Sequence, residues 1–344
     1  MTTTPTFGDA FAELTTPEGL SPRTVENVFG AILQGTWTPA QIAGLIVGMR
    51  LRGETAAQIA AAARAMRATM VPVDHGLERT LDTCGTGGDG QDTVNLSTGA
   101  AIIAAACGIP VAKHGNRAVS SRCGSANVVQ ELGIPLDVPP SRAATVLEQA
   151  GITFLMAPAH HPAMKYAAPV RNDLRVRTIF NILGPLSNPA RTTHQLLGTF
   201  DDALRPVLAE TLRELGVKRA WVVRGADGLD EVSPYGPTRV TELDAGEIRE
   251  LTVAPADFGL DVSPAGAARG SDPETNARIL LQILEGSDHP SRSAFLINAA
   301  AAIAVAEGGS LRDASTRADE ALRSGAARQR LEAWRSAASA AREG

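Results

Sequence analysis

The feature that most restricts the fold of this chain is a glycine-rich stretch between residues 81 and 125. Residues 85–90 read Gly-Thr-Gly-Gly-Asp-Gly, and four glycines in six positions permit positive φ and a close approach of a ligand to the backbone. The preceding segment, 80–84, is β-branched and partly apolar, which predicts a short strand entering the loop. Such a loop can direct several backbone N–H groups at one anion.

A helix and a second polar loop are predicted to follow the glycines. Ser97 or Thr98 is expected to cap a helix over residues 99–107, which Gly108 ends. The positive end of that helix faces back toward the glycine loop. The second loop, residues 113–121, reads Lys-His-Gly-Asn-Arg-Ala-Val-Ser-Ser and carries two cationic side chains. Two loops of this kind predict a site for a ligand with more than one phosphate.

Two common glycine-loop motifs fit the stretch less well. Gly85, Gly87 and Gly90 satisfy GxGxxG, but a dinucleotide site needs its helix to open within the loop and an acid about 20 positions later. Here the helix is predicted to begin well after the loop, and the first acid beyond Asp92 is Glu131. A Walker loop requires Gly-Lys-Ser/Thr, and this loop has no lysine. Two ordinary glycine turns would not require the polar series that follows.

Length and charge narrow the class of protein. A chain of 344 residues can bury a large core and predicts two domains. The net charge of -5 and the pI near 5.7 argue against a general affinity for nucleic acid or acidic membranes. Three cysteines without metal-like spacing suit a reducing compartment, and we find neither a signal peptide nor an apolar run of about 18 residues. We therefore expect a cytoplasmic protein that does not bind membranes.

The apolar pattern predicts an α/β fold preceded by a small α-helical domain. Before Thr80 the periodicity is helical, with starts at Ser21-Pro22 and Thr38-Pro39 and an alanine-rich helix over 54–70. We expect a helical domain at 1–75, with helices from about 163–188 packed onto it, and an α/β domain at 76–344. The helical stripes could form a dimer interface or simply pack within the domain, and we expect a homodimer.

From residue 80 onward, short strands alternate with helices, which is typical of a mostly parallel sheet covered on both faces. Besides 80–84, strands are predicted at 152–156, at 219–223 and near 240–243. Helices are predicted at 124–132, 141–150, 160–172 and 202–215 and over most of 272–343, and Gly-Pro-Leu-Ser-Asn-Pro at 184–189 predicts a tight turn.

Three clusters outside the two loops could carry chemistry. Asp-Gly-Leu-Asp-Glu at 227–231 follows a predicted strand, so its carboxylates could hold Mg²⁺ with substrate phosphates or form a solvated acidic turn. Arg171, with Arg175 and Arg177 nearby, could hold a carboxylate with two parallel hydrogen bonds or serve as a surface ion-pair partner. The pair at 160–161, His-His, lacks a companion ligand at helical spacing, so we do not expect a metal there.

Six motifs together resemble one enzyme family over most of the chain. They are GTGGDG, NLST at 95–98, KHGNRAVSS, HHPAMK, VRTIFNILGPLSNP and DGLDE, and they occur in the order and spacing of anthranilate phosphoribosyltransferases of tryptophan biosynthesis. The resemblance implies transfer of phosphoribose from 5-phosphoribosyl 1-pyrophosphate to anthranilate, with release of pyrophosphate and a requirement for Mg²⁺. It also implies a nucleoside phosphorylase/phosphoribosyltransferase-like fold, a homodimer, and a site in the cleft between the two domains.

The resemblance implies roles for individual residues. Ser97, Asp230 and Glu231 would hold Mg²⁺, and Gly85, Asn116 and Arg171 would contact anthranilate. We find no acid–base pair, so Lys113 and Arg117 are expected to stabilise the departing pyrophosphate by charge. The residues implied to bind 5-phosphoribosyl 1-pyrophosphate are Gly85, Gly88, Asp89, Thr93, Asn95, Leu96, Ser97, Thr98, Lys113, His114, Gly115, Asn116, Arg117, Ala118, Val119, Ser120, Ser121 and Ser125.

The chain departs from the family pattern at a few positions and leaves two alternatives to weigh. Arg122-Cys123 stands where Lys-Ser is common, Asn127 where aspartate is usual, and Arg224 where histidine is frequent; these bear on fine positioning rather than on the reaction. A pyrimidine nucleoside phosphorylase would attack the same ribose carbon with phosphate, but we do not find that family's motifs. An inactive scaffold should have lost the glycine loop or the acidic motif and gained a basic face, whereas both motifs are present.

Overall fold

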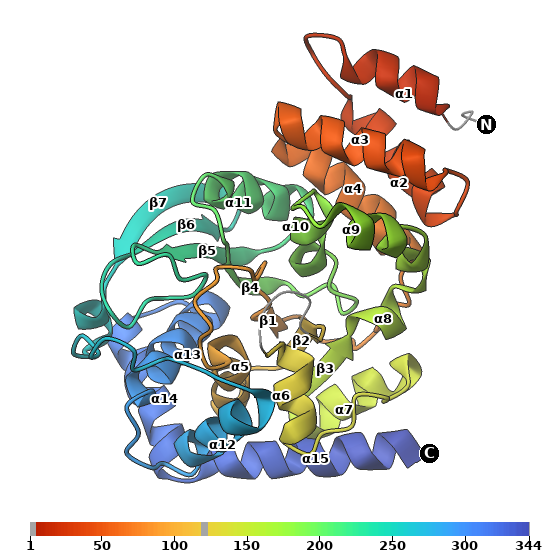
Figure 1. The fold of residues 1–344 in the computed structure, drawn as a ribbon. Helices are drawn as coiled ribbons and strands as arrows, with labels where there is room; N and C mark the ends of the chain where they lie inside the picture. Colours follow the sequence, from red (N-terminus) through yellow and green to blue (C-terminus); the bar gives the residue numbers. More distant parts are fainter. Residues whose placement is uncertain (1–4, 118–122, 344) are drawn as a thin grey trace.

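The computed structural model describes residues 5–117 and 123–343, and a seven-stranded sheet runs through its larger part (Figure 1). The strand order is β3-β2-β1-β4-β5-β6-β7; the first five of these pair in parallel, and β6 and β7 add an antiparallel edge. The predicted fold class is therefore confirmed. The strands are β1 (Leu81–Asp82), β2 (Val111–Gly115), β3 (Ile152–Met156), β4 (His194–Gly198), β5 (Arg219–Gly225), β6 (Thr238–Asp244) and β7 (Glu247–Val253).

Four helices form the N-terminal part: α1 (Phe7–Leu14), α2 (Pro22–Leu33), α3 (Pro39–Arg52) and α4 (Ala56–Thr69). The helix starts predicted at Ser21-Pro22 and Thr38-Pro39 are confirmed. In both, the hydroxyl of the first residue accepts a hydrogen bond from the backbone N–H three residues on, and the proline occupies the first helical position. The sequence did not predict α1, which Thr6 and Asp9 cap reciprocally.

The remaining helices cover both faces of the sheet. They are α5 (Leu96–Ala106), α6 (Ser125–Glu131), α7 (Ala143–Ala150), α8 (Ala157–His160), α9 (Ala168–Leu174), α10 (Phe180–Leu186), α11 (Leu204–Glu214), α12 (Pro273–Leu284), α13 (Arg292–Glu307), α14 (Leu311–Arg323) and α15 (Ala326–Glu343), with 3₁₀ helices η1 (Pro140–Arg142), η2 (Pro162–Tyr166) and η3 (Pro255–Phe258). One core joins α5 and α12–α15 to the sheet, and another joins α1–α4, α10 and α11 to its opposite face. Figure 1 shows these two layers on either side of the strands.

Three local predictions are corrected by the structure. The helix expected at 99–107 begins at Leu96, and no side chain caps it, because the Asn95 amide is engaged elsewhere. The helix expected at 160–172 is divided into α8, η2 and α9, since prolines at 162 and 169 interrupt the hydrogen-bond ladder. The Gly-Pro pair at 184–185 does not form a tight turn but lies in the last turn of α10.

The strand predicted near 240–243 is confirmed as β6, and the structure adds β7 at the sheet edge beside it. Two strands, β6 and β7, form a hairpin there, and the turn residues Ala245 and Gly246 have φ of 49° and 89°. Positive φ at both turn positions is the signature of a type I′ hairpin. The charged outer strand carried too little apolar pattern to be predicted from the sequence.

The helices of the middle segment pack against the N-terminal ones. α9 contacts α3, η2 contacts α2, and α10 contacts α4. Segments far apart in sequence therefore belong to one helical part. That part lies at one end of the molecule, beyond the carboxyl ends of the parallel strands (Figure 1). Within the described ranges no single helix is long and apolar enough to cross a membrane, although the bent pair α13–α14 passes on length and composition alone.

Candidate active site

The first glycine loop is fixed against the end of β4. The Thr86 N–H donates to the Gly198 carbonyl oxygen at 2.8 Å, and the Phe200 N–H donates to Thr86 Oγ1 at 3.1 Å. A Cβ at Gly85 would lie 3.1 Å from the same Gly198 oxygen, so a larger residue would push the two backbones apart. Gly88 has φ of 84°, a conformation that side chains rarely adopt. The glycines therefore serve a specific loop shape and not general flexibility.

A buried lysine joins the two loops. Lys113, in the middle of β2, is 1% exposed, and its Nζ donates to the Thr83 carbonyl oxygen at 3.2 Å and to Thr83 Oγ1 at 3.1 Å. Thr83 Oγ1 in turn donates to the Ser97 carbonyl oxygen at 2.9 Å. The cation thus lies beneath the first loop and close to the start of α5, where an anionic ligand would gain from its charge.

One buried carboxylate holds the bases of both loops, and the sequence analysis missed it. Asp82 Oδ1 accepts from the Cys84 N–H at 3.0 Å and from the His114 N–H at 3.3 Å, while Oδ2 accepts from Asn188 Nδ2 at 2.7 Å. Burial raises the pKa of Asp82 to about 6, and the nearby Lys113 opposes that shift. An acid inside a predicted buried strand was the available signal, because buried acids need such partners.

Three carboxylates gather opposite this lysine, and we call Asp89, Asp230 and Glu231 the acidic cluster. The Asp230 N–H donates to Asp89 Oδ2 at 3.4 Å, which brings the first loop to the turn after β5. Burial raises the pKa of Asp230 well above the usual carboxyl range, and the Asp89 charge adds to the shift. Burial and then the Asp230 charge raise the pKa of Glu231 likewise, with Lys113 acting in the opposite direction. No ion pair neutralises the cluster in the described part of the chain.

The acidic cluster suits a hard cation. Its donors are all oxygens, the ligands Mg²⁺ prefers, and Mg²⁺ is usually held by one or two carboxylates plus substrate phosphates. Among residues 5–117 and 123–343, no group of three or more His, Cys, Asp or Glu side chains is arranged to hold a metal by itself. A bound Mg²⁺ would therefore take further ligands from a substrate. Ser97 lies at the start of α5, and its backbone N–H favours the charged form of Glu231.

The other predicted residues around the start of α5 differ in what they can offer. Asn95 is held in place, since its Oδ1 accepts from Asn276 Nδ2 at 3.0 Å. Leu96 is fully buried in the core below the sheet, so only its backbone can face a ligand. Thr98 is also fully buried, and its hydroxyl has no hydrogen-bond partner among the described residues. Thr93 pairs with Arg269 in an isolated bridge.

The second loop is only partly described. His114 and Gly115 are buried in β2, and burial lowers the pKa of His114 to about 3, so its ring is neutral near pH 7. Asn116 and Arg117 are exposed, and Ser125 Oγ donates to the Asn116 carbonyl oxygen at 3.4 Å. The predicted ligands Ala118, Val119, Ser120 and Ser121, and the departure at Arg122, lie outside the described residues.

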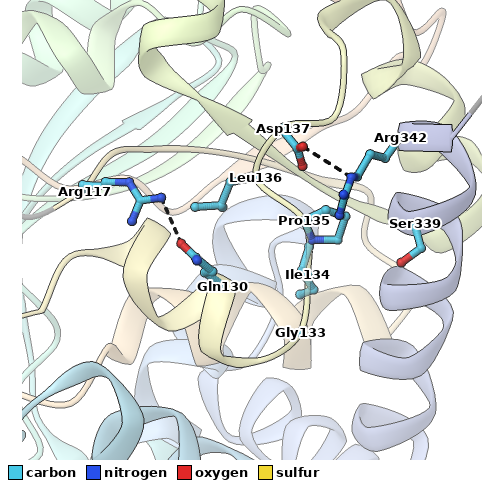
Figure 2. Close-up of a pocket in the computed structure, with 9 residues that line it drawn as sticks. All are labelled: Arg117, Gln130, Gly133, Ile134, Pro135, Leu136, Asp137, Ser339 and Arg342. Carbon is cyan, nitrogen blue, oxygen red and sulfur yellow. Dashed lines mark hydrogen bonds and ion pairs between the residues drawn. The ribbon is translucent and has the colours of Figure 1, made fainter.

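Arg117 lies in a different pocket from the one that the sequence suggested. Its Nη2 donates to Gln130 Oε1 at 2.9 Å, at one side of a pocket of about 430 Å³ between the ends of α6 and α15 (Figure 2). On the other side of this pocket, Arg342 pairs with Asp137 at 3.3 Å. The structure thus places Arg117 against α6, whereas Lys113 is directed at the first loop.

Two arginines of the α9–α10 segment rest on aromatic rings. The half-buried Arg171 lies over Phe180 at 5.9 Å from the ring centroid. Arg177 lies over Phe200 at 4.1 Å and donates through Nη2 to the Gly88 carbonyl oxygen. The sequence had presented Arg177 only as a neighbour of Arg171, and nothing in the spacing indicated that it would reach the glycine loop.

The glycine-rich loop, the buried lysine and the acidic cluster beside a helical bundle occur in a chain that matches a sugar-transferring class of enzyme. Residues 77–328 match the family model of the glycosyl transferase family, a/b domain. Residues 9–70 match the model of the glycosyl transferase family, helical bundle domain.

More specific relatives agree on one activity. The anthranilate phosphoribosyltransferase of Myxococcus xanthus is 45% identical over 330 residues, covering 95% of this chain and 98% of the relative. That of Rhodospirillum rubrum is 46% identical over 340 residues, covering 96% of each. The chain belongs to the anthranilate phosphoribosyltransferase family, and the resemblance drawn from its motifs is confirmed.

Solved structures of the family have the same fold. The anthranilate phosphoribosyltransferase of Thermus thermophilus superposes with a TM-score of 0.88 at 41% identity, covering 93% of this chain and 96% of that one. The Saccharomyces cerevisiae enzyme in complex with PRPP and Mg gives a TM-score of 0.89 at 29% identity, covering 97% and 98%. These relatives favour the transferase over the nucleoside phosphorylase alternative.

Proposed function

We propose that this chain transfers the phosphoribosyl group of 5-phosphoribosyl 1-pyrophosphate to the amine of anthranilate, releasing pyrophosphate, as the second step of tryptophan biosynthesis from chorismate. The observation that carries the proposal is the meeting of the glycine loop after β1, Lys113 of β2 and the acidic cluster after β5. A diphosphate ester with a bound Mg²⁺ matches that arrangement in both charge and ligand type.

The phosphoribosyl end would occupy the space between the two loops. Backbone N–H groups of Gly85, Gly88 and Asp89 would bind the pyrophosphate with Lys113, and the start of α5, with Leu96 and Thr98, would face it. Asn95, Thr93 and Ser125 would border the same pocket. Mg²⁺ would be held by Ser97, Asp230 and Glu231, and it would supply charge neutralisation to the leaving pyrophosphate. Residues 114–121 would complete this pocket, with Arg117 reaching the pyrophosphate after leaving Gln130.

Anthranilate would lie on the side of the helical part. Arg171, at the end of α9, can bind its carboxylate with a planar guanidinium, and Gly85 and Asn116 would border the ring. The aromatic amine is uncharged near neutral pH, so attack needs little help from a base. The residues of the two substrate sites would mainly hold the amine in line with the anomeric carbon and stabilise the negative charge that develops on pyrophosphate.

We further propose a homodimer formed through the helical domain, taken as residues 1–75 with the helices of about 163–188. Exposed apolar side chains on α1 and α3 support this interface, since Phe11 is 51% and Leu51 is 84% exposed. A cytoplasmic location is supported by three cysteines that form no disulfide in the described residues. Light scattering of wild type and of Leu51→Asp would test the interface; an unchanged mass in both would exclude it.

Anthranilate fluorescence tests the reaction directly. We expect a loss of the anthranilate signal that requires the protein, 5-phosphoribosyl 1-pyrophosphate and Mg²⁺ together, with stoichiometric release of pyrophosphate. Asp261→Asn, at an exposed loop position away from the cluster, serves as a matched control for acid substitutions. No signal loss at high concentration of folded protein would overturn the proposal, and uridine phosphorolysis under the same conditions would then support the alternative.

A further inference from the structure

Arg177 joins the α9–α10 segment to the first glycine loop through a contact that the proposed reaction does not use. It lies between α9 and α10, in the segment that follows Arg171, and its guanidinium reaches the Gly88 carbonyl oxygen in the first glycine loop. A Cβ at Gly88 would lie 3.3 Å from Arg177 Nη2, so the guanidinium packs directly on the loop backbone. It also borders a small crevice with Arg50 and Glu54 at the end of α3. Arg177 therefore lies between the end of α3 and the glycine loop.

The guanidinium is held in this position from the α/β side. Its centre lies 4.1 Å from the centroid of the Phe200 ring, well within cation–π range. The Phe200 N–H donates to Thr86 Oγ1 at 3.1 Å. Phe200 thus holds the loop at Thr86 through its backbone and orients Arg177 toward Gly88 through its ring. Thr86 and Gly88 of the same loop are thus linked to each other through Phe200 and Arg177.

The contact fixes the direction of a peptide in the anion loop. Because a trans peptide is planar, a carbonyl of Gly88 directed at Arg177 sends the N–H of Asp89 the opposite way. Without the guanidinium, that peptide could rotate at Gly88. The φ of Gly88 is 84°, a backbone conformation that glycine adopts readily and other residues rarely do. Asp89 also belongs to the acidic cluster, so its placement depends on the same peptide.

Arg177 also belongs to the segment that carries the proposed anthranilate ligand. Arg175 ends α9 in the left-handed conformation, with φ of 50°, and Arg177 follows two residues later. The Thr178 N–H then donates to Asn181 Oδ1 at 2.9 Å, which fixes the start of α10. With Arg171 over Phe180 and Arg177 over Phe200, this short segment is secured on two aromatic rings. Movement of the glycine loop at Gly88 is therefore passed to the segment of Arg171.

We propose that Arg177 is a positioning residue that couples the two substrate sites, so that 5-phosphoribosyl 1-pyrophosphate bound at the glycine loop strengthens the binding of anthranilate at Arg171. The inference rests on the proposed function. Because coupling between two bound ligands is reciprocal, anthranilate strengthens the binding of the phosphoribosyl donor by the same factor.

The experiment measures coupling rather than rate alone. Initial velocities are recorded over a grid of both substrates at saturating Mg²⁺, and the apparent KM for anthranilate is compared at low and at saturating 5-phosphoribosyl 1-pyrophosphate. We expect wild type to show a KM ratio of about 5 or more, the range typical of coupled sites. Arg177→Gln should bring the ratio close to 1, with a smaller change in kcat at saturation of both substrates. Phe200→Leu, which leaves the arginine but removes its platform, should reduce the ratio partway.

Arg175→Gln is the matched control, because it removes an arginine two positions away for which the described residues show no contact with the loop. It should keep the wild-type ratio. Arg177→Lys replaces Arg177→Gln if the latter does not fold; it keeps the charge but not the planar fork, and it should lower the ratio as well. A wild-type ratio in folded Arg177 variants, an equal loss in the Arg175 control, or no coupling in an active wild type would overturn the inference. An inactive wild type would instead overturn the proposed function.

Discussion

Two groups of acids near the sheet differ in how their charge is balanced. At the antiparallel edge, Arg205 donates to Asp202 at 2.7 Å and to Glu250 at 2.6 Å, and Arg239 donates to Asp202 at 2.6 Å. We call these four residues the paired network. The acidic cluster joins Asp89 of the first loop to Asp230 and Glu231 after β5, and no cation forms an ion pair with it in the described ranges. Arginines therefore pair with the acids of the paired network, whereas no arginine of the described residues pairs with the acidic cluster.

The pKa directions show what this difference means physically. The Arg205 hydrogen bond holds the pKa of Asp202 below its usual range, so ionisation favours the folded state there. Burial and like charge raise the pKa of Asp230, so its ionisation costs the folded state free energy. Acids that stabilise the fold are neutralised from within the chain. Under the proposed function, the charge of the acidic cluster would be balanced only when the substrate brings its Mg²⁺.

The largest effect should come from neutralising the cluster. In the double variant Asp230→Asn/Glu231→Gln, kcat/KM should fall by about 100-fold or more, because two oxygens that hold Mg²⁺ lose their charge. Initial rates over a Mg²⁺ titration measure the change, and the apparent Mg²⁺ requirement should rise in parallel. Wild-type rates at every Mg²⁺ concentration would remove the pair from the mechanism.

Binding of 5-phosphoribosyl 1-pyrophosphate with Mg²⁺ should balance the charge of the acidic cluster, as arginines already do in the paired network. With 5-phosphoribosyl 1-pyrophosphate and Mg²⁺ at about 100 times Kd, wild type should gain about 2.7 kcal/mol of stability, seen as a rise in Tm of several degrees. The double variant should gain much less, while Asp261→Asn should gain as much as wild type. A rise in Tm with Mg²⁺ alone that equals the rise with both ligands would show that the protein binds the metal without help from the substrate.

Breaking the paired network should affect stability but not chemistry. Arg205→Met removes a side chain only 8% exposed and leaves Asp202 and Glu250 without it, which should cost about 2 kcal/mol in urea unfolding. Arg323→Met serves as its control, because that arginine is 73% exposed and its ion pair with Asp319 should contribute under about 1 kcal/mol. The kcat of Arg205→Met should stay near wild type; a loss comparable to that of the double variant would contradict the division between the two groups.

The sequence predicted the chemistry of this site better than its geometry. The first loop, the acidic motif and the alternation of strands and helices follow local rules of turn chemistry and apolar periodicity, and they appear where predicted. Of the second predicted loop, residues 113–115 belong to β2, and residues 118–121 lie outside the described residues. Contacts between distant segments do not follow such rules. The reach of Arg177 to Gly88, the bond of Asn188 to Asp82 and the turn of Arg117 toward Gln130 depend on how the chain packs as a whole. The start of α5 was also misplaced, because a cap rule at Ser97 could not anticipate that Asn276 would engage Asn95.

The smallest expected effect gives the sharpest test. The same change, Asp→Asn, should alter the free energy of unfolding in opposite directions at two positions. In EDTA and without substrate, Asp230→Asn should raise the free energy of unfolding by about 1 kcal/mol, because it removes a charge that burial and Asp89 disfavour. Asp202→Asn should lower it by about the same amount, because Arg205 and Arg239 lose their anionic partner. Urea titrations of both variants at pH 7.5 measure the two changes. If both variants lose stability, the cluster is a structural element like the paired network, and the case for a substrate-borne cation at that site is lost.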